Sequence, residues 1–109
     1  MGGFVKGDVV VVPFPFSDLS STKRRPALVL ADASAGDLIL SQITSQNVSD
    51  SISIKIASSD FVMGALRGLS NVRPNKLFTA ESSIIAYKAG SLKPEKIKEV
   101  IDAIVRLLS

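Results

Sequence analysis

Three consecutive cations stand directly before a strongly apolar run in the first third of the chain. Lys23, Arg24 and Arg25 precede Pro26, and Ala-Leu-Val-Leu follows to position 30. Proline fixes its own φ and favours an extended backbone before it, so we expect the cations at the mouth of a strand. An arginine at the edge of a rigid sheet can donate two parallel hydrogen bonds to a phosphate, and it stays charged at any cellular pH. The stretch therefore predicts an anion site.

A second polar stretch contributes neutral hydrogen-bonding groups. Residues 41–46 read Ser-Gln-Ile-Thr-Ser-Gln and fall at the expected end of a different strand. Hydroxyl and amide groups both donate and accept hydrogen bonds. Together with the cations they fit a site for a phosphate group.

The composition limits the chemistry that such a site can perform. The chain has 109 residues, 46% of them hydrophobic, which fits a single domain over 1–109 that folds without a metal or a disulfide. Histidine and cysteine are absent. Acid–base chemistry must then use carboxylates, Lys, Tyr, Arg or water, and a zinc or iron site would need carboxylates alone. We expect neither a metal nor a cofactor.

Charge and hydropathy bear on location and partners. The net charge is +3, and the excess of cations lies between Lys23 and Lys88. Such an excess fits a nucleic-acid partner but equally an ordinary solvated surface. The first residues lack a basic segment followed by a long apolar core, and no window reaches the length of a membrane span. The sequence therefore predicts a soluble cytoplasmic protein without a membrane contact.

The elements that must position these residues are mostly short strands. Residues 17–23 are predicted to form a polar loop, 32–37 a hairpin connection, and 60–68 a loop or a short turn of helix. Pro74-Asn75 predicts a turn inside 70–80, which forms either two short strands or one bent strand. The expected strands are 9–14, 27–31, 38–44 and the alternating segment 52–56, and 83–89 is a further apolar segment.

The period changes to that of a helix near the end of the chain. Apolar residues recur at helical spacing over 94–108, and Pro94 suits the first helical turn. Several short strands followed by one amphipathic helix predict a mainly β protein with α structure. We expect a small closed or half-closed antiparallel barrel on which the helix packs.

Several motifs occur in an order that resembles the MazF/PemK family of toxin–antitoxin ribonucleases. The resemblance covers nearly the whole chain. The motifs are 7–14 (Gly-Asp-Val-Val-Val-Val-Pro-Phe), 23–30 (Lys-Arg-Arg-Pro-Ala-Leu-Val-Leu), 43–46 (Ile-Thr-Ser-Gln), 68–78 (Gly-Leu-Ser-Asn-Val-Arg-Pro-Asn-Lys-Leu-Phe) and 90–95 (Gly-Ser-Leu-Lys-Pro-Glu).

The resemblance implies a fold, an activity and partners. The fold would be the SH3-like β-barrel of the MazF/PemK and CcdB-related toxins, assembled as a homodimer. The activity would be sequence-specific, metal-independent cleavage of single-stranded RNA by a type II toxin. Attack by the RNA 2′-hydroxyl would leave a 2′,3′-cyclic phosphate and a 5′-hydroxyl. A MazE/PemI-like antitoxin would silence it.

The resemblance also implies roles for individual residues. Arg25 matches the family's catalytic arginine before the proline, and Thr44 matches the hydroxyl residue at the end of the third strand. Arginine, with a pKa above ~12, is a poor proton acceptor. Many members carry an acidic residue and a glycine before the arginine, where this chain has Ser-Ser-Thr-Lys at 20–23. Asp18 is then the candidate for proton transfer.

Other candidates would bind RNA, each with an ordinary structural alternative. Arg24 would face solvent or contact the RNA backbone, because neighbouring strand residues point to opposite faces. The remaining side chains would contact RNA, cap a loop, fill the barrel end or solvate an edge. They are Lys23, Ser45, Gln46, Phe16, Arg73 and Lys76.

Two other functions remain open at this point. A non-catalytic barrel that binds RNA or a protein would lack the cleavage activity. A gyrase poison of the related toxins depends on an aromatic residue near the carboxyl terminus, and the last residues, Arg-Leu-Leu-Ser at 106–109, offer none.

Overall fold

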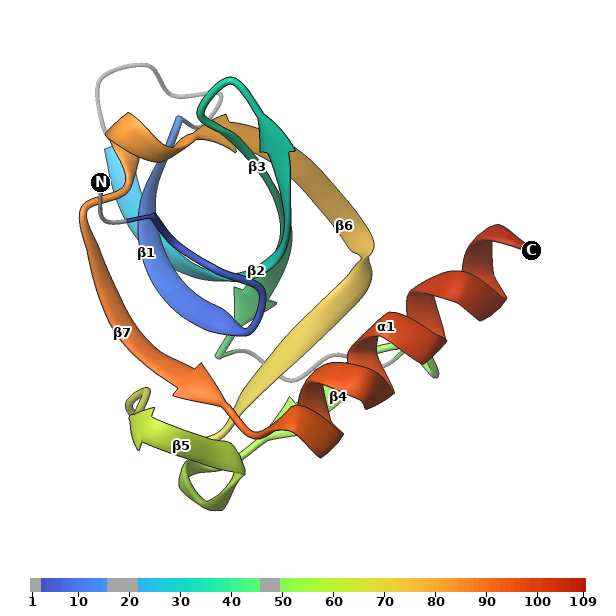
Figure 1. The fold of residues 1–109 in the computed structure, drawn as a ribbon. Coiled ribbons are helices and arrows are strands. Elements are labelled where there is room, and N and C mark those ends of the chain that lie inside the picture. Colours follow the sequence, from blue (N-terminus) through green and yellow to red (C-terminus); the bar gives the residue numbers. More distant parts are fainter. Residues whose placement is uncertain (1–2, 16–21, 46–49) are drawn as a thin grey trace.

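The computed structural model describes residues 3–15, 22–45 and 50–109, and their strands form one curled antiparallel sheet (Figure 1). Within these residues the strand order across the sheet is β4-β6-β3-β2-β1-β7-β5. The predicted small antiparallel barrel with a C-terminal helix is confirmed. The strands are β1 (Asp8–Pro15), β2 (Thr22–Ser34), β3 (Asp37–Thr44), β4 (Ile54–Ile56), β5 (Phe61–Gly64), β6 (Ser70–Glu81) and β7 (Tyr87–Leu92), with 3-10 turns at Ser58–Asp60 and Ser82–Ile84 and the helix α1 at Pro94–Leu108.

The apolar run of β1 is buried on both faces of the sheet. Val9 packs in one hydrophobic cluster with Leu28 and with Ile104 of the helix. Val10 lies in a second cluster, which includes Val29. Since alternate residues point to opposite faces, a sheet covered on both sides needs the unbroken apolar sequence that β1 and β2 carry.

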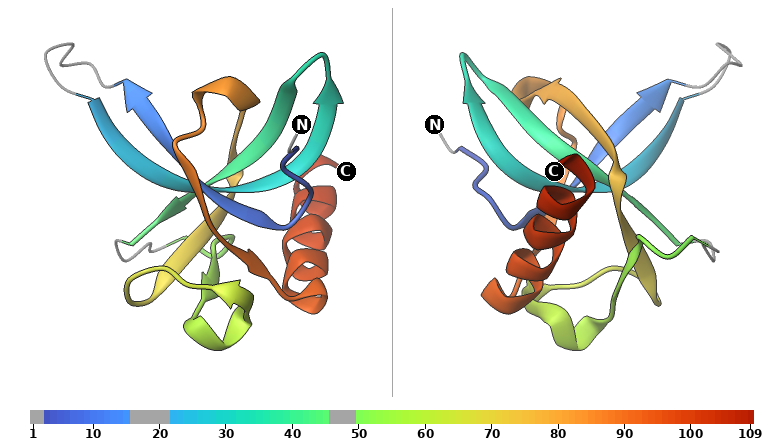
Figure 2. Two further views of the ribbon diagram at one scale, coloured as in Figure 1. Left: turned by 60° about the vertical axis from the view of Figure 1, so that its left-hand side comes forward. Right: turned by 90° about the vertical axis from the view of Figure 1, so that its right-hand side faces the viewer.

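The helix α1 lies over one side of the curled sheet and packs against β6 (Figure 2). Its inner face buries Val100, Ala103 and Ile104, whereas Lys98 Nζ and Asp102 Oδ2 form an exposed i,i+4 ion pair of 2.8 Å. Pro94 occupies the first turn, where its missing N–H costs no helical hydrogen bond. The helix predicted over 94–108 is therefore confirmed.

β6 is one bent strand, which decides between the two predicted forms of 70–80. Ser41 pairs with Leu77 and Ile43 with Val72, so residues 73–76 all lie opposite Gln42. Such a bulge accommodates a proline, which cannot donate to a regular ladder. The Ser41 hydroxyl donates to the Arg73 carbonyl at 2.6 Å and ties the bulge to β3.

Two predicted elements, the loop over 17–23 and the strand over 52–56, had wrong boundaries. β2 begins at Thr22 rather than after a loop ending at 23, because its polar residues still pair with β1 up to Pro15. The alternating strand expected over 52–56 is confined to Ile54–Ile56. Its alternation is confirmed, since Ile54 and Ile56 are buried and Lys55 is exposed.

The prediction of a loop or short helical turn over 60–68 missed a strand. β5 pairs with β7 at one edge of the sheet, and only Phe61 of its residues is buried. The apolar segment 83–89 likewise divides into a 3-10 turn and the start of β7, which continues past Gly90. A side chain at Gly90 would collide with the backbone oxygen of Met63, so the glycine permits the β5–β7 approach.

Candidate functional site

The two adjacent arginines of β2 lie on opposite faces of the sheet. Arg25 pairs with Val12 of β1 and is half-buried, whereas Arg24 pairs with Pro13 and is exposed. Arg24 lines a surface pocket of about 660 Å³ in which Arg25 takes no part. The alternation predicted for these two side chains is confirmed.

The strand register, continued past its last pair, brings Arg25 and Thr44 to the same face of the sheet. β2 and β3 pair Ala27 with Gln42, and the same register continued by two residues along each strand brings Arg25 opposite Thr44. One residue further on each strand, Arg24 and Ser45 line the same pocket, which agrees with this register. Opposite residues in an antiparallel pair share a face, with Cβ atoms about 5 Å apart.

The same row continues across the next two strands. Thr44 pairs with Asn71 of β6, and Asn71 pairs with Lys55 of β4. Thr44 and Asn71 are both buried, at 8% exposure, and Lys55 is exposed. We call these four residues, Arg25, Thr44, Asn71 and Lys55, the Arg25 row. It combines two cations with a hydroxyl and an amide, which are donors suited to a phosphate.

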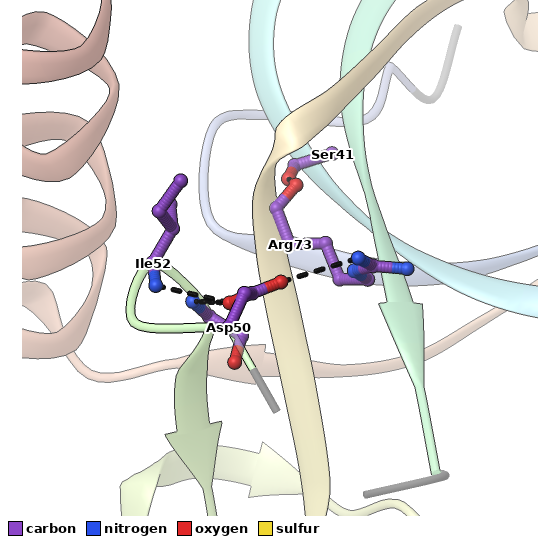
Figure 3. Close-up of polar contacts among 5 residues, drawn as sticks. Ser41, Asp50, Ile52 and Arg73 are labelled. Atoms are coloured by element: carbon purple, nitrogen blue, oxygen red, sulfur yellow. Dashed lines mark hydrogen bonds and ion pairs between the residues drawn. The ribbon is translucent and has the colours of Figure 1, made fainter. Parts of the chain in front are cut away.

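Arg73 lies near this row but is held by an aspartate. Its guanidinium contacts the Asp50 carboxylate at 3.2 Å, while the backbone N–H groups of Ile52 and Ser53 donate to the same carboxylate at 2.9 and 2.8 Å (Figure 3). The hydrogen bond from Ser53 lowers the pKa of Asp50, and those from Ile52 and Arg73 act in the same direction against desolvation. Asp50 is thus a weak base, and the RNA-binding role predicted for Arg73 remains a prediction.

The surface pocket gathers residues from distant parts of the chain. Of the predicted residues whose side chains the structure describes, it contains Arg24 and Ser45. Three further polar side chains, on the segment after β5 and on β7, were missed by the sequence reasoning. The pocket is lined by Val11, Arg24, Pro26, Ser45, Ala65, Leu66, Arg67, Ser70, Tyr87, Lys88 and Ala89, and we call it the Arg24 pocket.

A weak sequence signal for the missed residues existed. Arg67 stands between Gly64 and Gly68 in a segment read as a loop, and Tyr87 is the only tyrosine of the chain. Their approach to Arg24 depends on the pairing of β7 with both β1 and β5, which local sequence did not reveal.

Several predicted residues stay untested. Phe16, Asp18 and Gln46 lie outside the described residues, and of Lys23 only the backbone is described, opposite Phe14. Lys76 is exposed in the bulge of β6.

Two further observations concern metals and membranes. Within 3–15, 22–45 and 50–109, no three side chains of the metal-ligating types His, Cys, Asp and Glu gather at one place. In the same part of the chain, no helix has both the length and the apolar character needed to cross a membrane.

Sequence and structure comparisons point to the same family. Residues 5–108 match the model of the PemK-like, MazF-like toxins of type II toxin–antitoxin systems. The chain therefore belongs to this toxin family. No curated protein sequence is significantly similar to it.

Solved structures share the fold at low sequence identity. The chain resembles MazF in a MazE–MazF complex from Deinococcus radiodurans, with a TM-score of 0.77, 19% identity and coverage of 96% of this chain and 95% of that one. It also resembles a mycobacterial endoribonuclease bound to its cognate antitoxin, with a TM-score of 0.76, 14% identity and coverage of 97% of this chain and 95% of that one. A third similar structure is the Mycobacterium tuberculosis toxin MazF-mt6, with a TM-score of 0.72, 15% identity and coverage of 93% of this chain and 95% of that one. At these identities the likeness concerns the fold.

Proposed function

We propose that this toxin is a metal-independent endoribonuclease that cleaves single-stranded RNA at short specific sequences. The main support for this proposal is the Arg25 row, which contains a half-buried arginine and a buried threonine. Family membership and the fold shared with structures described as endoribonucleases support it. Cleavage at these residues needs neither histidine nor cysteine, both of which the chain lacks.

The reaction is an internal transesterification of the RNA. The 2′-oxygen attacks the adjacent phosphorus, the bond from phosphorus to the 5′-oxygen breaks, and a 2′,3′-cyclic phosphate and a 5′-hydroxyl result. The nucleophile belongs to the substrate, so the protein contributes alignment and stabilisation of the charge that develops on the phosphorane. Arg25 donates to the non-bridging oxygens, and the Thr44 hydroxyl adds a further hydrogen bond.

The transesterification also requires two proton transfers. The 2′-hydroxyl loses a proton as it attacks, and the departing 5′-oxygen gains one. Arg25 is too weak a base to accept the first proton. Asp18, in the segment before β2, is the residue that we propose for proton transfer.

Family membership also supports a proposal about the protein partners of this toxin. The related structures include complexes with MazE or a cognate antitoxin. We infer that a MazE/PemI-like antitoxin silences this toxin, and that the toxin acts in the cytoplasm as a homodimer.

The first experiment is cleavage of a long single-stranded RNA in EDTA by wild type, Arg25→Ala and a control, Arg106→Ala, which removes an exposed arginine of α1. Wild type and control should cut at a recurring sequence with cyclic-phosphate ends. Arg25→Ala should be slower by roughly a thousandfold, since one preorganised donor of this kind is worth about that much. Intact RNA from folded wild type would reject the nuclease and favour a binding module.

A further inference from the structure

The Arg24 pocket has the properties of a second ligand site. Three cations line it, Arg24 from β2, Arg67 from the segment after β5, and Lys88 from β7. Tyr87 stands among them with 53% of its surface exposed. The volume of about 660 Å³ lies within the range of small-ligand pockets, roughly 300–1,000 Å³.

The charge of the pocket is one-sided. Among the described residues, none that lines the pocket is acidic. Asp8, which is buried, contacts Lys88 Nζ at 3.3 Å. Asp8 also accepts hydrogen bonds from Ser91 Oγ and from the backbone N–H of Val5. It therefore fixes the Lys88 ammonium at the pocket, while a lysine still has further N–H donors to offer a ligand.

The pocket adjoins the Arg25 row through the chain itself. Arg24, Ser45 and Ser70 line it, and each is the sequence neighbour of a residue in the row. The paired residues of β2 and β3 end at Ala27 and Gln42. Arg24 and Ser45 of the pocket lie beyond that pair, as do Arg25 and Thr44 of the row.

We propose that the Arg24 pocket binds a nucleotide of the RNA next to the scissile phosphate, its phosphate held by Arg24 and Arg67 and its base stacked on Tyr87. This inference rests on the proposed function, because it takes the Arg25 row as the place of cleavage. Basic grooves that carry exposed aromatic rings are typical of single-strand binding. The hydroxyls of Ser45 and Ser70 supply hydrogen bonds to base edges.

An acidic peptide is the competing ligand for a basic pocket. RNA fits better because the aromatic ring and the two hydroxyls match a base, whereas a peptide carboxylate would need only the cations. A peptide that occupies the pocket is therefore an outcome of the test.

The test compares two RNA substrates and two assays. One oligonucleotide carries only the nucleotides at the cut site, and the other extends beyond it. Binding is measured by fluorescence anisotropy, and cleavage by kcat and KM. The variants are Arg67→Ala, Tyr87→Ala and Tyr87→Phe, with Lys98→Ala as a control for loss of an exposed cation outside the pocket.

The expected result separates affinity from rate. Tyr87→Ala should raise Kd and KM for the extended RNA roughly tenfold, and Tyr87→Phe should restore them, since stacking needs the ring and not its hydroxyl. Arg67→Ala should also weaken binding and reduce the salt dependence by about one phosphate contact. The cut-site oligonucleotide and Lys98→Ala should behave as wild type.

A second readout maps the contact directly. Extended RNA with 4-thiouridine at successive positions should crosslink to the peptide that holds Tyr87. Cleavage without this crosslink, with unchanged affinity in both pocket variants, would overturn the pocket and leave the nuclease intact. Loss of RNA binding in the pocket variants without any cleavage by wild type would reject the nuclease and retain the pocket. Unchanged RNA affinity with weakened binding of an acidic antitoxin peptide would assign the pocket to the peptide.

Discussion

The two faces at this end of the sheet carry cations in very different surroundings. On one face, Arg25 is half-buried, and Thr44 and Asn71, which pair with each other, are buried. On the other, Arg24 and Arg67 are exposed and border an open pocket with an exposed tyrosine. A single step along β2 separates the two arginines.

This difference in burial predicts that the two faces contribute to different steps, one to the rate of cleavage and the other to RNA binding. Donors fixed in a partly desolvated site stabilise developing charge strongly, because they need no reorganisation during the reaction. Exposed cations are screened by salt and steer or hold a polyanion more weakly. We therefore expect changes on the Arg25 face to lower the rate and changes on the Arg24 face to weaken binding.

After Arg25→Ala, the largest effect in this comparison should come from Thr44→Val, which removes the hydroxyl and nearly preserves the shape. We expect kcat on RNA to fall about a hundredfold with KM little changed, as for loss of one oxyanion donor. Thr79→Val is the matched control, the same change at an exposed position of β6, and should leave kcat near wild type. Equal losses in the two variants would show that the effect is not specific to the Arg25 row.

The second effect concerns stability. Asn71 is a buried polar residue of the Arg25 row. Asn71→Ala removes a buried amide, and loss of a buried hydrogen-bonding group costs about 1–3 kcal/mol. Urea denaturation should show this loss, whereas Asn75→Ala, an exposed change in the bulge of the same strand, should change the unfolding free energy by less than about 0.5 kcal/mol. An unchanged free energy of unfolding in Asn71→Ala would mean that the Arg25 row tolerates loss of its buried amide.

The sequence predicted one face better than the other. Pro26 and the apolar run after it determined β2 and the place of Arg25, and the hydroxyl-rich end of β3 determined the place of Thr44. Both signals are local, because strand type and alternation follow from neighbouring residues. The helix was predictable for the same reason, from its period and Pro94.

The other face depends on contacts between distant segments. Only Phe61 of β5 is buried, so this segment lacks the alternation of apolar and polar residues that indicates a strand. Its pairing with β7 brings Arg67 near Tyr87 and Lys88. Asn71 was missed for a related reason, since only the β3–β6 register shows that it lies beside Thr44. Register between strands far apart in sequence is not encoded by local periodicity.

A smaller effect is expected for Arg24→Lys, which keeps the charge but loses the planar fork of donors. In an exposed position, we expect KM for an extended RNA to rise about threefold and kcat to stay unchanged. Arg25→Lys is the matched change on the other face, and it should lower kcat by far more because the buried site uses the geometry of the guanidinium. A large fall in kcat for Arg24→Lys would place Arg24 in the reacting site.

The smallest effect should be the dependence of stability on pH at Asp50, which anchors Arg73 beside the Arg25 row. The pKa of Asp50 is lowered from its usual value of 3.8, first by the hydrogen bond from the Ser53 backbone. The ionised carboxylate therefore adds stability above the unfolded-state pKa, and this contribution disappears as the pH falls through the folded-state pKa. Asp50→Asn should melt slightly below wild type near neutral pH. Thermal melts should converge as the pH falls below the usual value, and a gap that stays constant over the whole range would show that ionisation of Asp50 does not contribute.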